Sequence, residues 1–222
     1  MSTRPLQPFL NRVLLGDCLQ VMRAMPPASV DYVLTDPPYL VRYRSRDGRT
    51  LANDDQAQWL PPAFAAIARL LKPHRFCVSF YGWQAADQFL AAWRAAGLRP
   101  VGHFVWTKDY TSSSLGYTRA RHECAYLLAK GEPILSQPAP PDVLPWGRYT
   151  HNLLHPTQKP VEALLPLIAA YSEVGDIILD PFAGSGTTAV AAHQLQRRYV
   201  AIELRPAYHA LACQRLQAAA PL

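Results

Sequence analysis

The stretch Asp176-Ile177-Ile178-Leu179-Asp180-Pro181-Phe182-Ala183-Gly184-Ser185-Gly186-Thr187-Thr188 decides the fold of this 222-residue chain. It begins with an apolar run of the kind found in buried strands, and a helical pattern starts at Thr187. The glycines between them let the backbone approach a ligand closely, and the start of the helix offers free N–H groups to an anion. The stretch therefore predicts a strand, a ligand-binding loop and a helix.

The loop lacks the features of two common nucleotide sites. It does not end in Gly-Lys-Ser/Thr, as a P-loop does, and it lacks the third glycine of the dinucleotide fingerprint. A Gly-x-Gly is also compatible with a tight packing turn. Glu203 favours a ligand, because it ends the next predicted strand at a spacing that suits an acid binding ribose hydroxyls. We therefore expect an adenosine-containing ligand.

Outward from this unit, short apolar runs alternate with helical patterns, which is typical of a mostly parallel sheet with helices on both faces. Strands are predicted at 13–17, 30–35, 76–81, 176–180 and 199–203, and an antiparallel pair at one edge from 98–108 and 124–129. Helices are predicted at 56–71, 83–96, 161–171, 187–196 and 206–217. The expected fold is a single α/β domain over residues 1–222 with a seven-stranded sheet.

Four acids end predicted strands or follow them directly: Asp17, Asp36, Asp180 and Glu203. In open α/β sheets the ligand crevice lies at the carboxyl ends of the strands. Any one of these acids could instead be a helix cap. Together they predict one acidic crevice.

Composition and charge narrow the class of protein. Half of the residues are hydrophobic and 17% are charged, which is typical of a globular chain. Lys and Arg number 22 against 16 Asp and Glu, an excess that favours a polyanionic partner but is also compatible with simple solubility. The cysteines at 18, 77, 124 and 213 form no C-x-x-C pair, so we expect no metal site, and reduced thiols in a cytoplasmic protein. The first ten residues predict neither a signal peptide nor a membrane anchor.

Asp36-Pro37-Pro38-Tyr39 follows a predicted strand into this crevice. The prolines stiffen the segment and have no N–H groups, so its carbonyl oxygens have few internal donors. An NH2 group could donate one hydrogen to Asp36 and one to a prolyl carbonyl, while Tyr39 stacks on a flat ring. Such acceptors favour a pyramidal amine whose lone pair points at a methyl donor, and a base in this position must leave the duplex stack. The alternative is a plain proline-rich turn.

On these motifs the chain resembles the amino-group DNA methyltransferases, which make N6-methyladenine or N4-methylcytosine. The catalytic motif matches Asp36-Pro37-Pro38-Tyr39, and the cofactor motif matches the stretch from Asp180 to Thr188. A further cofactor motif matches His155-Pro156-Thr157-Gln158-Lys159-Pro160, Gly16-Asp17-Cys18 resembles the adenine-binding segment, and Glu203 the ribose-binding acid. The resemblance extends from about Leu14 to Leu216 and implies a Rossmann-like methyltransferase domain.

The resemblance implies S-adenosylmethionine as cofactor and double-stranded DNA as substrate, and it suggests a homodimer. The cofactor-binding residues it implies are Asp17, Cys18, Asp36, His155, Thr157, Gln158, Lys159, Asp180, Phe182, Ala183, Gly184, Ser185, Gly186, Thr187, Thr188 and Glu203.

Motif order indicates the β group of these enzymes, because the catalytic segment precedes the glycine loop. Asp at position 36 favours adenine N6, with cytosine N4 as the alternative. Protein-glutamine methyltransferases carry Asn-Pro-Pro-Tyr after the glycine motif, and cytosine-C5 enzymes need a Pro-Cys pair that is absent here. Two hypotheses of a different kind are a DNA-binding protein with an inactive methyltransferase fold, and an RNA or protein methyltransferase.

The chain departs from the β group in its target-recognition region. Only residues 109–121 and 132–151 are candidates, so we expect a short recognition site or relaxed specificity. Residues 40–53 predict a flexible basic loop. Its arginines are compatible with contacts to DNA phosphates and also with a simple solvated surface. The predicted DNA-binding residues are Arg42, Arg44, Arg46, Arg49, Lys108, Arg119 and Arg121. Trp106 is expected in the core.

Overall fold

Eight strands form one sheet in the order β1-β10-β9-β2-β3-β7-β4-β8 in the computed structural model. The structure describes residues 5–43, 48, 50, 52–111, 113–114, 117–147 and 158–219. The strands of this sheet are β1 (Arg12–Leu15), β2 (Tyr32–Thr35), β3 (Arg75–Phe80), β4 (Arg99–Thr107), β7 (His122–Lys130), β8 (Val143–Pro145), β9 (Ile177–Asp180) and β10 (Arg198–Glu203). A separate hairpin pairs β5 (Ser113–Ser114) with β6 (Arg119–Ala120).

The sheet is mostly parallel, as predicted. The pairs β1–β10, β10–β9, β9–β2, β2–β3 and β4–β8 are parallel, and the antiparallel pairs are β3–β7 and β7–β4. Among the eight strands of this sheet, β7 alone therefore runs against the others. The predicted antiparallel pair is confirmed as β4 and β7. These strands extend the sheet on the side of β3 that is opposite β2 and β9.

The sheet has eight strands where the sequence predicts seven. The additional strand, β8, lies within residues 132–151, where the sequence predicts a recognition loop and no strand, and it forms the edge beside β4. The backbone N–H of Val105 donates to Asp142 O (2.8 Å), and that of Trp146 donates to Thr107 O (3.0 Å). Leu144 and Trp146 are buried, so apolar burial fixes this short strand despite its prolines.

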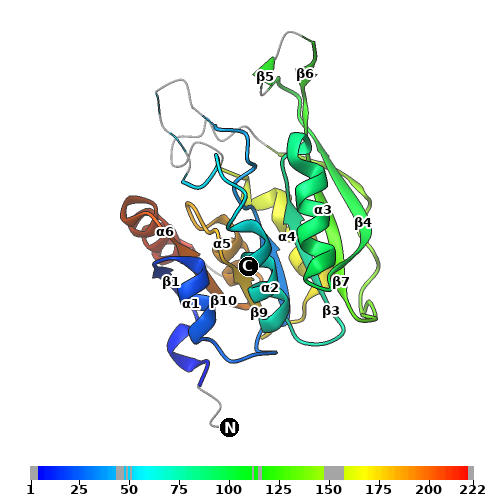
Figure 1. Ribbon diagram of the computed structural model, residues 1–222. Helices are drawn as coiled ribbons and strands as arrows, with labels where there is room; N and C mark the ends of the chain where they lie inside the picture. The colour runs from blue at the N-terminus through cyan, green and yellow to red at the C-terminus, as the bar shows by residue number, and fades with distance from the viewer. Residues whose placement is uncertain are drawn as a thin grey trace.

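Helices cover both faces of the sheet, as predicted (Figure 1). One layer holds α1, α2 and α3, and the other holds α4, α5 and α6. Their bounds are α1 (Cys18–Ala24), α2 (Leu60–Leu70), α3 (Ala86–Ala95), α4 (Val161–Tyr171), α5 (Thr187–Gln194) and α6 (Pro206–Ala218), with 3-10 turns η1 (Gln7–Phe9) and η2 (Trp83–Ala85).

Three helices differ from the prediction: α1 is additional, α2 starts later, and α3 begins at Ala86 because the first residues of the predicted range 83–96 form the 3-10 turn η2. The α1 helix was not predicted; the Asp17 side chain caps it by accepting from the N–H groups of Leu19 (2.9 Å) and Gln20 (3.1 Å). The α2 helix begins at Leu60 and not at residue 56, because Pro61 and Pro62 suit the first turn, where their missing N–H groups cost no hydrogen bond.

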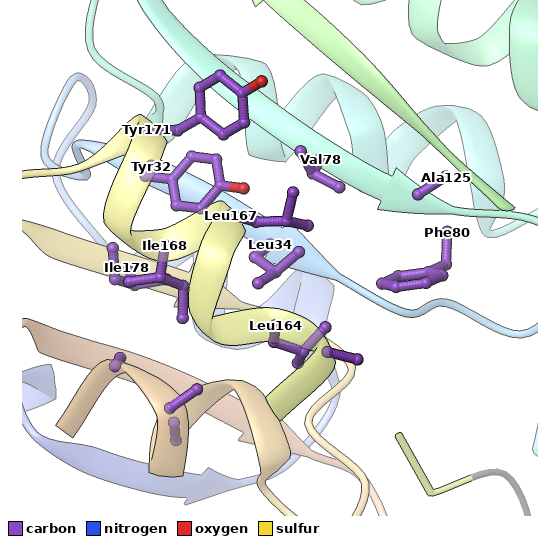
Figure 2. Close-up of a cluster of buried hydrophobic side chains, with 14 of the residues drawn as sticks. Tyr32, Leu34, Val78, Phe80, Ala125, Leu164, Leu167, Ile168, Tyr171 and Ile178 are labelled. Atoms are coloured by element: carbon purple, nitrogen blue, oxygen red, sulfur yellow. The ribbon is translucent and has the colours of Figure 1, made fainter. Parts of the chain in front are cut away.

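The core beside α4 fills the space between this helix and the centre of the sheet. Figure 2 shows Leu167 of α4 beside Leu34 of β2 and Val78 of β3, and Ile168 of α4 beside Ile178 of β9. Trp106 of β4 belongs to the same cluster and is 0% exposed, which confirms it as a core residue. Its indole N–H donates to Ala163 O (3.1 Å), and its ring stacks on Phe80 with centroids 4.9 Å apart.

No helix in the described ranges combines the length and apolar character needed to cross a bilayer. The loops expected at 40–53, 109–121 and 132–151 lie partly outside the described residues, and the described parts include the β5–β6 hairpin and β8.

Trp106→Ala should lower the free energy of unfolding by about 3–5 kcal/mol, because it opens a cavity and leaves Ala163 O without its donor. Trp83 is 70% exposed, so Trp83→Ala is the matched control and should change it by less than about 0.5 kcal/mol. Urea denaturation followed by circular dichroism measures both values. Equal losses for the two variants would contradict the assignment of Trp106 to the core.

Candidate active site

A cleft opens where the parallel strands end, and its empty space, including its open mouth, is about 1210 Å³. Its walls come from the residues that follow β1, β2, β9 and β10, which lie side by side in the sheet. All four acids predicted at strand ends line it: Asp17, Asp36, Asp180 and Glu203. The structure thus brings the predicted catalytic segment, Asp36 to Tyr39, the glycine loop and the predicted ribose-binding acid into one cleft.

The glycine loop owes its shape to two left-handed residues, Gly184 (φ 53°) and Gly186 (φ 80°). A Cβ on Gly186 would lie 2.8 Å from the Cβ of Ala212 in α6. Both this close contact and the positive φ exclude a larger residue at position 186. Arg215 of α6 also holds the loop, since its Nη1 donates to the carbonyl (2.6 Å) and hydroxyl (2.9 Å) of Ser185. Glu203 Oε2 accepts from the N–H of Gly184 (2.8 Å), which ties β10 to the loop.

Asp180 ends β9 as a buried carboxyl group. Its Oδ1 accepts from the Thr35 hydroxyl (3.1 Å) and from the N–H of Phe182 (3.1 Å). Burial raises the pKa of Asp180 to about 7, and these hydrogen bonds, with one from Thr188, only partly oppose the rise. The group therefore changes charge near neutral pH.

Asp36 directly follows β2 and faces Lys159. Lys159 Nζ donates to Asp36 Oδ2 at 2.6 Å, while Asp36 Oδ1 is buried with no hydrogen-bond partner among the described residues. Burial raises the pKa of Asp36 above its ordinary value, although Lys159 lowers it. One carboxylate oxygen is thus held by a cation, and the other is a buried acceptor without a partner among the described residues, in a residue that lines the cleft.

The ammonium group of Lys159 lies at the catalytic segment. Lys159 is 6% exposed, and its Nζ also donates to the hydroxyl of Tyr39 (3.2 Å). The same Nζ lies 5.2 Å from the ring centroid of Tyr39, 4.9 Å from that of Phe80 and 5.9 Å from that of Trp146. The resemblance places Lys159 among the cofactor residues, whereas the structure directs its charged end to Asp36.

Lys108 also takes a different place from the expected one. The sequence puts it among the phosphate ligands, but it is 6% exposed and its Nζ pairs with Glu123 Oε1 at 2.5 Å. Glu123 Oε2 in turn accepts from the Tyr39 hydroxyl at 3.4 Å. Glu123 was not predicted, although one signal was available: it shares an inward-facing row of β7 with the buried apolar residues Ala125, Leu127 and Ala129.

Asp54 is a second residue that the sequence did not reveal. Its buried carboxylate accepts from the backbone N–H groups of Leu40 (2.8 Å) and Tyr43 (2.5 Å). These hydrogen bonds form a clasp, in which Asp54 joins the segment after Tyr39 to the segment before α2 at the rim of the cleft. Leu40, Arg42 and Asn53 all have positive φ there, a strain that the clasp holds in place.

The remaining predicted site residues divide into three groups. Cys18, Gln158, Phe182, Ala183, Thr187 and Thr188 line the cleft, as do Pro37 and Pro38. Arg42, Arg119 and Arg121 are exposed, and one guanidinium nitrogen of Arg121 donates to Lys108 O (3.2 Å). Arg44, Arg46, Arg49, His155 and Thr157 lie outside the described residues.

Two curated proteins are similar to this chain in sequence over most of its length. "Putative methylase YubD" of Escherichia coli strain K12 is 53% identical over 209 residues, which cover 94% of this chain and 91% of the relative. "DNA adenine methyltransferase YhdJ" of the same strain is 28% identical over 246 residues, which cover 93% and 83%.

Solved structures show the same fold at lower identity. The M1.HpyAVI–SAM complex aligns with a TM-score of 0.74 at 22% identity and covers 92% of this chain and 98% of that one. The cytosine-N4-specific PvuII DNA methyltransferase aligns with a TM-score of 0.75 at 18% identity and covers 92% and 88%.

The family model of the N6/N4 DNA methylases, described as DNA methylase, matches residues 30–214. This match takes in both the segment after β2 and the glycine loop after β9. The chain belongs to the N6/N4 DNA methylase family.

Proposed function

We propose that this chain transfers a methyl group from S-adenosylmethionine to the exocyclic N6 of an adenine flipped out of duplex DNA. The observation that carries the proposal is the unpartnered acceptor oxygen of Asp36, a residue that lines the same cleft as the glycine loop. Two relatives support the choice of cofactor and base, since one solved neighbour is a SAM complex and YhdJ is named as a DNA adenine methyltransferase.

The cleft has the donors and acceptors that S-adenosylmethionine requires. Gly184 and Gly186 bring the backbone close to the ligand, and the start of α5 offers N–H groups to its carboxylate. Asp36 and Asp180 are carboxyl groups that suit a cationic ligand. S-adenosylmethionine supplies an electrophilic methyl group on a sulfonium centre.

The residues after β2 would prepare the amine for attack. Asp36 Oδ1 would accept a hydrogen bond from one N–H of the base amine, and a carbonyl oxygen of the Pro37-Pro38 segment would accept from the other. These two bonds would direct the nitrogen lone pair towards the methyl donor. Tyr39 would stack on the ring, since its hydroxyl is held by Lys159 and Glu123. After transfer, the nitrogen must lose a proton, and Asp36 is the carboxylate in reach of it.

Cytosine N4 is the second candidate target. Its amino group offers the same two hydrogens, and the fold of the cytosine-N4-specific PvuII enzyme matches this chain. A DNA-binding protein without activity is opposed by the glycine loop and by Asp36, which both have the features that the reaction needs.

Incubation of the protein with labelled S-adenosylmethionine and duplex DNA, followed by nucleoside analysis, tests the proposal. We expect N6-methyladenine. N4-methylcytosine alone would replace the adenine assignment, and no methylated nucleoside under conditions where the cofactor binds would reject the enzyme. Sequencing methylated DNA from cells that express the chain would also give the recognition sequence.

Asp36→Asn should reduce methyl transfer by at least about 100-fold, because the amide cannot act as an anionic acceptor for the amine. Cofactor affinity, measured by calorimetry, should change far less than this. Asp55→Asn is the matched control, because Asp55 is exposed and does not line the cleft. Full activity of Asp36→Asn would remove Asp36 from the chemistry.

The affinity for S-adenosylmethionine should rise between pH 6 and pH 8 with a midpoint near 7. The pKa of Asp180 is about 7, so its carboxyl is neutral below this pH and is an anion above it, where it attracts the cationic cofactor. Asp180→Asn should weaken binding about tenfold at pH 8 and remove this rise. Calorimetry at three pH values measures both effects, and an unchanged affinity for the variant would contradict the assignment.

A further inference from the structure

A second carboxylate, Glu123, lies behind the catalytic segment. It projects from the start of β7, and its side chain is 22% exposed. Lys108 Nζ holds Oε1 at 2.5 Å, and the hydroxyl of Tyr39 lies 3.4 Å from Oε2. Glu123 therefore contacts the residue that we propose to stack on the base, yet it belongs to no motif in the sequence.

The charges of this region alternate from β4 to the cleft. The order is Lys108, Glu123, Lys159 and Asp36, and the Tyr39 hydroxyl is the shared link between Glu123 and Lys159. Buried charges are costly unless each has a partner of opposite sign. Here Lys108 pairs with Glu123 and Lys159 pairs with Asp36, and the two ion pairs meet at the Tyr39 hydroxyl.

Electrostatics keeps Glu123 an anion. Burial acts to raise the pKa of Glu123, but the ammonium groups of Lys159 and Lys108 outweigh it, so the pKa is lowered. Trp146 covers both cations, with its ring centroid 4.9 Å from Lys108 Nζ and 5.9 Å from Lys159 Nζ. A fixed anion thus lies next to the ammonium group that pairs with Asp36.

We propose that Glu123, anchored by Lys108, is a positioning residue of the amine site: it fixes the Tyr39 hydroxyl and places a second anion, besides Asp36, near the Lys159 ammonium. An incoming base amine must share Asp36 with Lys159. With Glu123 present, an anion stays near the Lys159 ammonium while the amine binds Asp36. This inference rests on the proposed methyl transfer.

The proposal predicts opposite pH shifts for two variants. The groups that face Asp36 are Lys159, which lowers its pKa, Glu123, which raises it, and Tyr39 and Asp180. Activity needs the carboxylate form, so it falls as pH drops through the pKa of Asp36. Glu123→Gln should therefore move the acidic limb of the kcat profile to lower pH, and Lys159→Met should move it to higher pH.

The experiment measures kcat from pH 5 to pH 9 with duplex DNA for wild type, Glu123→Gln and Lys159→Met. At the plateau, Glu123→Gln should lose roughly three- to tenfold in kcat, the equivalent of one weakened hydrogen bond. Its affinity for S-adenosylhomocysteine, measured by calorimetry, should stay within about twofold of wild type. Glu132→Gln is the matched control, because Glu132 lies beyond the far end of β7, paired with Arg99, and should leave the profile unchanged.

Glu123→Gln leaves the buried Lys108 without its anion, which can destabilise the fold. The double variant Lys108→Met/Glu123→Gln removes both charges, so it tests the role of Glu123 without leaving an unpaired buried cation. A shift to lower pH in either variant supports the proposal. Acidic limbs that coincide with wild type in an active, folded protein overturn it. A wild type that forms no methylated nucleoside rejects the proposed function instead, and the two failures are therefore distinct.

Discussion

One buried hydrogen bond joins the two halves of the site: the Thr35 hydroxyl donates to Asp180 Oδ1 at 3.1 Å. It connects the ends of β2 and β9, which are parallel neighbours with Val33 opposite Leu179. Residues 145 positions apart in the chain thereby meet at one edge of the sheet. Parallel neighbours point their carboxyl ends the same way, so the segment after Thr35 and the loop after Asp180 share a cleft. Any shift between these strands would separate Asp36 from the glycine loop, and the site depends on their register.

Burial of acids gives this cleft its chemical character. The pKa values of Asp36, Asp180 and Glu203 are all raised, in each case mainly by burial. Carboxylates that lose solvation gain more from a nearby cation than exposed ones do. Lys159 already supplies such a cation to Asp36, whereas the donors to Asp180 are all neutral and come from Thr35, Phe182 and Thr188. The side of the cleft near Asp180 is therefore the one that gains most from a positively charged ligand.

The parts of this site that the sequence predicts are those set by local pattern. Apolar runs that end in acids identify the strands, and the glycines mark a loop that only left-handed residues can form. Glu123 was missed because its partners, Tyr39 and Lys108, come from other segments and meet it only through strand pairing. The short strand β8 was missed because prolines surround it and its stability comes from two buried side chains. For Lys159 the segment was predicted, but the direction of its ammonium follows from tertiary contacts with Asp36 and three aromatic rings.

The arrangement also separates two tasks of the proposed reaction. In this proposal Asp36 and the proline segment would recognise an amino group with two hydrogens, which adenine and cytosine both have. The ring of Tyr39 accepts any base, because every base has a flat face. The groups that prepare the amine therefore carry little information about which base bears it. Discrimination must come from contacts to the rest of the ring and to the neighbouring nucleotides. The candidates that we propose for those contacts are Arg42, which is exposed after Tyr39, and the β5–β6 hairpin, which projects beyond β4 and β7 in Figure 1. Substitutions at these two places would then alter the target while the charges behind Tyr39 stay the same.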